Sequence, residues 1–289
     1  MDWITGIQKA IDYIEAHLTE EIDYNKIAAE SFSSCYHFQR IFSILCGYTV
    51  GEYIRLRRLS AAGAELASGK EKVINVALKY GYDSPDSFTK AFQKFHGITP
   101  SKVRTDGNTL KSFSRLSIKI SLEGGGTMNY RIEEKEAFYV LEKVETHSLE
   151  NEQNQTSIPD FWSRSYDNGT MDKLMELSND KTYIFGICYG NSSPNQKTFE
   201  YSIAAKCAAD TDIPNDFRKR QIPAKTWVVF PCIGPMPNAI QDMWKKLVSE
   251  FFPTAEYQPT YEMDIEAYTQ GDMDSADYRS EIWVPIKTK

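Results

Sequence analysis

The residue pattern of the first third of this chain recurs after about 50 positions. Five residues reappear 50 positions later, namely Ser34, Phe38, Phe42, Gly47 and Thr49 as Ser84, Phe88, Phe92, Gly97 and Thr99. Upstream, Ile27-Ala28 matches Val76-Ala77 at an offset of 49. A repeat of this kind means that one structural unit is built twice, and it constrains the fold more than any other feature of the sequence.

Each copy of the repeat has the pattern of a short apolar helix, a tight turn and a second helix that begins after a capping serine, Ser34 or Ser84. Apolar residues in the two second helices fall at i, i+3, i+4 and i+7, namely Phe38, Ile41, Phe42 and Leu45, then Phe88, Ala91, Phe92 and Phe95. This spacing predicts one buried face per helix. Together these features predict two helix-turn-helix units.

The opposite faces of the two second helices carry polar side chains at equivalent positions. They are Tyr36, Gln39, Arg40 and Ser43 in the first copy and Asp86, Thr89, Lys90 and Gln93 in the second. Such side chains can bind base edges or phosphates. Between the copies, residues 50–67 have helical periodicity and predict a rigid spacer, so the two helices could enter successive major grooves, which are roughly 34 Å apart.

Several segments of residues 4–104 together resemble the DNA-binding domain of the AraC/XylS family. They are SCYHFQRIF at 34–42, GYTVGEYIR at 47–55, Val76-Ala77 with Gly81-Tyr82, and FQKFHGITP at 92–100. The resemblance implies that Tyr36, Gln39 and Arg40 contact one major groove and that Asp86, Thr89 and Lys90 contact the next. It also implies double-stranded DNA and RNA polymerase as partners, with a monomer on the DNA.

Asp86 and the charge of the chain depart from what DNA binding favours. A carboxylate at Asp86 repels phosphate and can accept a hydrogen bond only from a base donor such as cytosine N4. The net charge is −7, but residues 1–127 carry 16 Lys and Arg against 14 Asp and Glu, whereas residues 128–289 carry 17 against 26. The first part is therefore weakly basic and the acidity belongs to the second.

The sequence predicts two domains: residues 1–108 bind DNA, residues 109–127 form a linker that ends in Gly124-Gly125-Gly126, and residues 128–289 form the second domain. Long apolar runs and a signal peptide are absent, so we expect a cytoplasmic protein without a membrane partner. The five cysteines form no CxxC pair, and neither His37 nor His96 has another ligand at metal-binding spacing. We therefore expect no metal and no cofactor.

A second repeat lies in the second half of the chain. The pattern IxDxW occurs at Ile158–Trp162 and again at Ile240–Trp244, each time at the end of a strand-then-helix unit. Six segments rich in β-branched and aromatic residues predict strands at 137–144, 182–189, 198–205, 225–230, 261–268 and 281–286. The expected α+β domain is an internally duplicated, mostly antiparallel sheet with two helices on one face.

Residues 128–289 resemble the GyrI-like effector-binding domain of Rob-like AraC regulators. The resemblance rests on Gly234-Pro235, Phe252-Pro253, IEAY at 265–268 and IWVPI at 282–286. It implies that Glu266 binds a small cationic or lipophilic effector. Alternation along residues 261–268 predicts that Met263, Ile265 and Ala267 pack on the helices, while Glu266 and Tyr268 point into a cleft on the other face.

Aromatic side chains could line that cleft, because a carboxylate among rings suits an apolar cation. The candidates are Trp162, Tyr189, Tyr201, Trp227 and Trp283, each of which could instead be an ordinary core residue. Likewise, Glu266 and Tyr268 could belong to a solvated strand face.

The leading hypothesis is a transcription regulator that binds a promoter and senses a small molecule. Two alternatives concern the second domain. It could hydrolyse small electrophiles with Glu266 and a neighbouring tyrosine as acid and base. It could also be a protein-binding module without a ligand.

Overall fold

The computed structural model describes residues 3–30, 35–69, 71–105, 107–117, 127–150, 153–190 and 197–289. Both Ser34 and the three consecutive glycines at 124–126 lie outside these residues. The chain divides into two compact units. The first comprises Met1–Phe32 and Cys46–Ser121, and the second comprises Ser33–Leu45 and Leu122–Lys289. The second helix of the first repeat, α3 (Cys35–Cys46), thus belongs almost entirely to the second unit.

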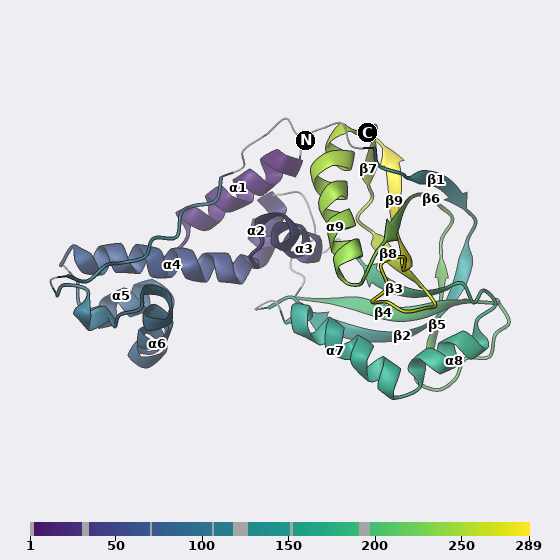
Figure 1. Ribbon diagram of the computed structural model, residues 1–289, viewed down its shortest axis with the longest axis horizontal. Helices are drawn as coiled ribbons and strands as arrows, with labels where there is room; N and C mark the ends of the chain where they lie inside the picture. Colours follow the sequence, from purple (N-terminus) through teal and green to yellow (C-terminus); the bar gives the residue numbers. More distant parts are fainter. Residues whose placement is uncertain are drawn as a thin grey trace. The chain divides into compact units, whose positions relative to one another are not determined.

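The first unit is all-helical (Figure 1). Its elements are α1 (Trp3–Ala16), α2 (Tyr24–Glu30), α4 (Val50–Ala67), α5 (Val73–Lys79), α6 (Pro85–His96) and the 3-10 turn η1 (Pro100–Lys102). As predicted, α4 is a long spacer helix; the Thr49 side chain accepts from the Glu52 amide in a capping box that fixes its start. Apolar side chains of α4, α5 and α6 form one core that includes Leu59, Leu66, Val76, Phe88 and Phe92.

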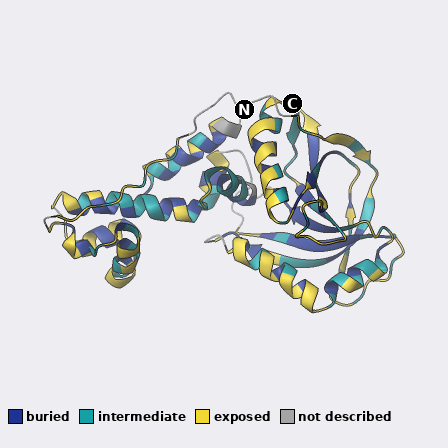
Figure 2. Ribbon diagram, in the orientation of Figure 1, coloured by how far each residue is buried: buried dark blue, intermediate teal, exposed yellow. Residues whose placement is uncertain are grey.

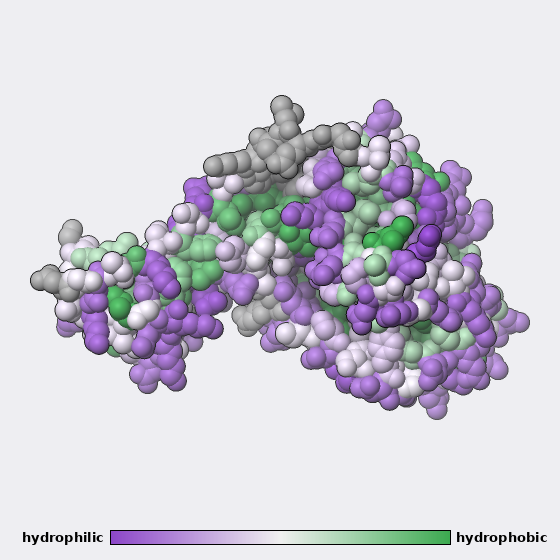
Figure 3. All heavy atoms as spheres, viewed as in Figure 1, coloured by the Kyte–Doolittle hydropathy of each residue, from purple (hydrophilic) through white to green (hydrophobic). Residues whose placement is uncertain are grey.

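The helix α6 confirms the expected pattern of the second copy. Ser84 caps it, since its hydroxyl accepts from the Ser87 amide at 3.2 Å, and Pro85 occupies the first turn. The buried side chains Phe88 and Phe92 face the core. Figure 2 shows exposed positions along the other face of this helix, and Figure 3 shows that the surface over it is mainly hydrophilic.

Residues 107–117, most of which fall in the predicted linker, are held against α4 and α6. The Lys111 amide donates to His96 Nδ1 at 3.1 Å, the Phe113 amide to Ser60 Oγ at 3.0 Å, and the Leu116 amide to Tyr53 Oη at 3.2 Å. His96 itself packs in the core, with Nε2 3.0 Å from the Leu59 carbonyl oxygen. The start of the expected linker is therefore part of the first unit's structure.

The second unit contains an antiparallel sheet in which β3 and β8 lie at the centre (Figure 1). The order is β1-β6-β9-β8-β3-β4-β2-β5, and β7 pairs with β9. The strands are β1 (Arg131–Lys135), β2 (Phe138–Ser148), β3 (Tyr183–Tyr189), β4 (Thr198–Cys207), β5 (Arg218–Ile222), β6 (Lys225–Ile233), β7 (Tyr257–Pro259), β8 (Met263–Thr269) and β9 (Arg279–Thr288). All six predicted strands are present, and the short strands β1, β5 and β7 were not predicted.

The strand order confirms the internal duplication. On one side of the centre β2, β4 and β3 are neighbours, and on the other side β6, β9 and β8 are neighbours in the same arrangement. Each half carries a helix with the IxDxW pattern, α7 (Asn154–Asp167) or α9 (Asn238–Lys246). The remaining helices are α8 (Thr170–Leu177), the π-type turn η3 (Leu247–Phe251) and α10 (Phe252–Thr254).

The two faces of the sheet are used in the opposite way to the one we predicted. Met263, Ile265 and Ala267 lie in a core formed by the strands themselves, with Phe185 and Trp227. The other face packs on helices, as the cluster of Phe230, Ile282 and Val284 with Trp244 of α9 shows. Glu266 and Tyr268 therefore point toward the helices, because successive side chains of a strand alternate between faces. Among the described residues, no helix is long and apolar enough to span a membrane.

Candidate functional site

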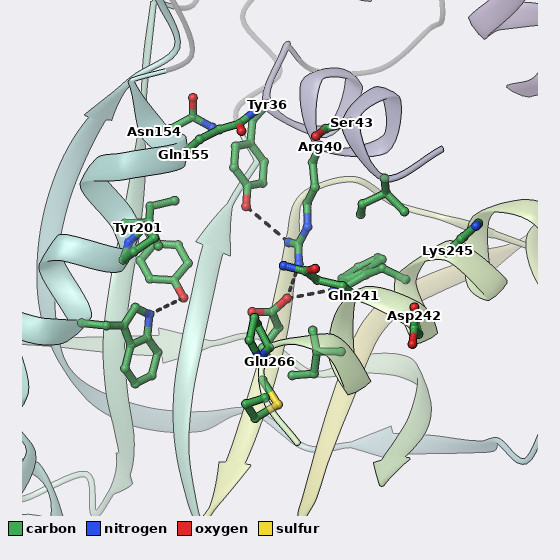
Figure 4. Close-up of a pocket in the computed structure, with 18 of the residues that line it drawn as sticks. Tyr36, Arg40, Ser43, Asn154, Gln155, Tyr201, Gln241, Asp242, Lys245 and Glu266 are labelled. Atoms are coloured by element: carbon green, nitrogen blue, oxygen red, sulfur yellow. Dashed lines mark hydrogen bonds and ion pairs between the residues drawn. The ribbon is translucent and has the colours of Figure 1, made fainter. Parts of the chain in front are cut away.

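A cavity of about 730 Å³ lies in the second unit, between α3, α7 and α9 and over strands β4 and β8 (Figure 4). Its walls include Trp162 from α7, Trp244 from α9 and Tyr201 from β4. Glu266 and Tyr268 of β8 form its floor. A volume of this size suits a drug-sized organic molecule.

The carboxylate of Glu266 is held by two donors from the cavity wall. Trp244 Nε1 donates to Oε1 at 2.9 Å, and the Tyr268 hydroxyl donates to Oε2 at 2.7 Å. The Glu266 side chain is only 12% exposed, and the almost fully buried Asp264 lies two residues earlier on the same face of β8. Two carboxylates in a low-dielectric setting make this region strongly attractive to a cation.

Aromatic rings surround the carboxylate on the α7 side. Trp162 Nε1 donates to the Tyr201 hydroxyl at 2.9 Å, and the Trp162 ring meets the Tyr268 ring edge to face at 5.1 Å. Burial raises the pKa of Tyr268 and of Tyr201 well above that of a free phenol, so both hydroxyls stay protonated. The wall therefore combines apolar surface with fixed polar atoms.

Gly186 of β3 creates room for this aromatic wall. It pairs with Glu266 across the β3–β8 ladder. A Cβ atom at Gly186 would overlap the Tyr201 hydroxyl and would come within 3.1 Å of the Trp162 ring. The absence of a side chain is thus required by the Trp162–Tyr201 pair.

The guanidinium of Arg40, from α3, reaches into the same cavity and points at Glu266 (Figure 4). Arg40 Nη2 pairs with Glu266 Oε1, and Nη1 lies 3.2 Å from Asp264 Oδ1. The guanidinium carbon is 4.4 Å from the centre of the Trp244 ring, within the range of a cation–π contact. Desolvation is the largest single influence and lowers the pKa of Arg40, but the interactions with Glu266, Tyr36 and Asp264 together raise the pKa well above its ordinary value.

Two more polar residues of α3 are buried in the second unit. The Gln39 side chain donates to the Leu149 carbonyl at 2.9 Å, and Gln39 is 1% exposed. The Tyr36 ring packs on Phe199 at 4.2 Å, and Tyr36 is 7% exposed. The sequence predicted an outward face with Tyr36, Gln39 and Arg40, and in this structure that prediction is wrong because the face packs inside the second unit. Their role in DNA binding stays a prediction. It requires that these side chains leave their present contacts in the second unit when α3 binds DNA.

The corresponding residues of α6 are accessible. Asp86 and Lys90 are exposed and Thr89 is half-buried. These side chains remain available for the DNA contacts that the sequence predicts.

Four of the seven predicted ligand residues line the cavity: Glu266, Tyr268, Trp162 and Tyr201. The other three lie elsewhere. The Tyr189 hydroxyl donates to the buried Glu142 at 2.6 Å, with the Arg220 guanidinium 3.9 Å from its ring centre. Trp283 lies in the core between strands, as does Trp227.

Sequence reasoning missed three residues of the site: Trp244, Asp264 and Gly186. The IxDxW repeat held the signal for Trp244, since this residue is the counterpart of Trp162. Asp264 shares the alternating face of Glu266, which is also visible in the sequence. The need for Gly186 depends on the position of Tyr201 on another strand and has no local signature.

Two family models match the chain. The model described as "Integron-associated effector binding protein" covers residues 131–286, more than half of the chain. A helix-turn-helix domain model covers residues 27–106.

Curated relatives match between 35% and 40% of the chain. YbfP of Bacillus subtilis, an uncharacterized HTH-type transcriptional regulator, is 41% identical over 100 residues, which are 35% of this chain and 34% of YbfP. AarP of Providencia stuartii, an HTH-type transcriptional activator, is 36% identical over 115 residues, which are 40% of this chain and 85% of AarP. The match thus spans about a third of the length of YbfP but most of AarP.

A solved structure resembles the second unit. SAV2435, solved in complex with tetraphenylphosphonium, is 25% identical with a TM-score of 0.50, and the match covers 55% of this chain and 94% of that protein.

Proposed function

The chain belongs to the family of integron-associated effector-binding proteins and joins that domain to an AraC-type helix-turn-helix domain, and we propose that it regulates transcription in response to a lipophilic organic cation bound at Glu266. The arrangement of Glu266 is the observation that carries this proposal. A carboxylate fixed by Trp244 and Tyr268 at the floor of a cavity with aromatic walls is a preorganised cation site.

The energetics of the cavity favour a cation with apolar groups. Pairing with Glu266 offsets the cost of moving the charge out of water. Each ring that faces the cation adds about 0.5 to 2 kcal/mol. The relative SAV2435 binds a ligand of this chemistry, tetraphenylphosphonium, which makes that compound the natural probe.

The DNA-binding part of the proposal rests on the two helix-turn-helix units. Double-stranded DNA is the proposed partner, with Asp86, Thr89 and Lys90 of α6 in one major groove and Tyr36, Gln39 and Arg40 of α3 in the next. Contact with RNA polymerase and binding as a monomer are further parts of the proposal that follow from the family.

The hydrogen bonds of Glu266 favour sensing over hydrolysis. Both carboxylate oxygens are engaged, by Trp244 and Arg40 on Oε1 and by Tyr268 on Oε2. A general base needs a lone pair directed at the substrate or its water. Tyr268 is a weak acid here because burial raises its pKa.

Isothermal titration calorimetry with tetraphenylphosphonium tests the proposed function. We expect saturable binding to the full-length protein and at least a tenfold loss of affinity in Glu266→Gln, which keeps the shape but removes the charge; a tenfold change corresponds to about 1.4 kcal/mol. Glu262→Gln is the matched control, because Glu262 lies just before β8 and pairs with Lys225 outside the cavity. Equal binding by all three proteins would overturn the assignment of Glu266.

A further inference from the structure

Arg40 occupies the place in the cavity that a cationic ligand would take. Building on the proposed function, we propose that Arg40 is an internal ligand of the cation site, so that α3 and a cationic effector exclude one another from Glu266. Binding of the effector would then release the polar face of α3 and make it available to DNA.

The contacts of Arg40 are those of a bound cation. Its guanidinium pairs with Glu266 and Asp264 and lies over the Trp244 ring. Tyr36, one helical turn earlier, contributes its hydroxyl at 3.3 Å from Nη1. These are the charge pairing and the ring contact on which the proposed effector would depend. A second cation could not share them without placing two like charges close together in a poorly hydrated space.

Charge balance identifies the class of effector that can replace Arg40. Removal of the guanidinium leaves Glu266 and Asp264 close together, one largely and one almost fully buried, without their cation. Breaking a buried ion pair by removing one partner is strongly destabilising, because it leaves an uncompensated buried charge. An incoming monocation restores the balance, whereas a neutral lipophilic molecule does not replace the lost positive charge of Arg40. The effector class is therefore an organic cation rather than a neutral hydrophobe.

The exclusion also links the cavity to DNA recognition. The residues of α3 predicted to bind DNA are Tyr36, Gln39 and Arg40. In this structure all three instead contact other residues of the second unit, namely Phe199, the Leu149 carbonyl and the two carboxylates. One side chain cannot make both sets of contacts at once. The state described here is therefore the one in which α3 cannot read DNA.

Competition by Arg40 predicts that removing its charge improves cation binding. Affinity for tetraphenylphosphonium is measured by calorimetry for the full-length wild type, Arg40→Gln and the control Arg164→Met. Arg164 is an exposed arginine of the same unit that pairs with Glu145 and does not line the cavity. We expect Arg40→Gln to bind about tenfold more tightly or better, because an internal competitor reduces the apparent affinity by the fraction of open sites. Arg164→Met should bind like the wild type.

A second measurement follows Arg40 in the wild-type protein and does not depend on how a variant folds. Phenylglyoxal modifies accessible arginine side chains, and mass spectrometry locates the modified residues. Saturating tetraphenylphosphonium should increase the rate of modification at Arg40 severalfold and leave Arg164 unchanged. A ligand that simply covered Arg40 would instead protect it.

The outcomes separate the exclusion from the proposed function. The exclusion is overturned if the cation binds the wild type at Glu266, Arg40→Gln binds it no more tightly, and the cation protects Arg40 from phenylglyoxal. The proposed function stands in that case. If neither the wild type nor Arg40→Gln binds the cation, the proposed function falls and the exclusion with it. Binding by Arg40→Gln alone supports both.

Discussion

The helices α3 and α6 occupy equivalent positions in one sequence repeat, yet their polar faces have different surroundings. On α6, Lys90 is exposed. On α3, the counterpart Arg40 is 20% exposed and pairs with two carboxylates more than 220 residues away in the chain. A repeat can thus reproduce a helix and its polar face, while distant residues determine what that face contacts.

The contributions of the two units can be distinguished by substituting one closely packed glycine in each unit. In the first unit a Cβ atom at Gly63 would come within 2.7 Å of the His96 ring, and in the second a Cβ at Gly186 would overlap the Tyr201 hydroxyl. Overpacking of this kind costs about 1 to 3 kcal/mol. We expect Gly63→Ala and Gly186→Ala to lower the free energy of unfolding by about 2 kcal/mol each, measured by urea denaturation.

Only the second of these substitutions should affect the cavity. Gly186→Ala should also weaken tetraphenylphosphonium binding, because Tyr201 and Trp162 must move. Addition of Tyr201→Phe should restore part of the lost stability, since it removes the overlapping hydroxyl. An equal effect of Gly63→Ala on cation binding would contradict the separation of the two sites.

We expect the charge of Glu266 to restrain α3 and so to keep its polar face from DNA, a restraint that α6 does not have. Glu266→Gln should raise affinity for DNA about tenfold or more in the absence of a cation, because Arg40 loses its main partner and α3 is released more often. Fluorescence anisotropy with DNA from upstream of the coding region, at one fixed salt concentration, measures this. Glu262→Gln should behave as the wild type. Unchanged DNA binding by Glu266→Gln would show that α3 is not restrained by this ion pair.

A smaller effect on DNA binding is expected for a substitution in α6. Lys90→Ala should weaken DNA binding about threefold to tenfold and reduce the salt slope by about 1, as for the loss of one phosphate contact. The ratio of affinities with and without the cation should stay the same, since Lys90 lies outside the cavity. A change in that ratio would mean that α6 also takes part in the response.

Much of the fold was predictable because it depends on local periodicity. Apolar spacing located the buried faces of α3 and α6, where Phe38, Phe42, Phe88 and Phe92 are indeed fully buried. Strand-like composition located all six of the strands we predicted. The short strands β1, β5 and β7 were missed because they carry too few residues to show a period.

The site was predictable only in part, because its geometry depends on which surfaces meet. Alternation showed that Glu266 and Tyr268 share a face of β8, but not that this face meets the helices. The same limit applies to Tyr189 and Trp283, whose aromatic character fits a cavity wall and a sheet core equally well. The pairing of Arg40 with Glu266 joins two parts of the chain with no local signal in either.

The structure of the complex with tetraphenylphosphonium tests the central claim most directly. The account predicts that the phosphonium centre lies where the Arg40 guanidinium now lies, close to Glu266 and the Trp244 ring, and that α3 has left the cavity. A complex in which the cation is bound while Arg40 still pairs with Glu266 and Asp264 would contradict it.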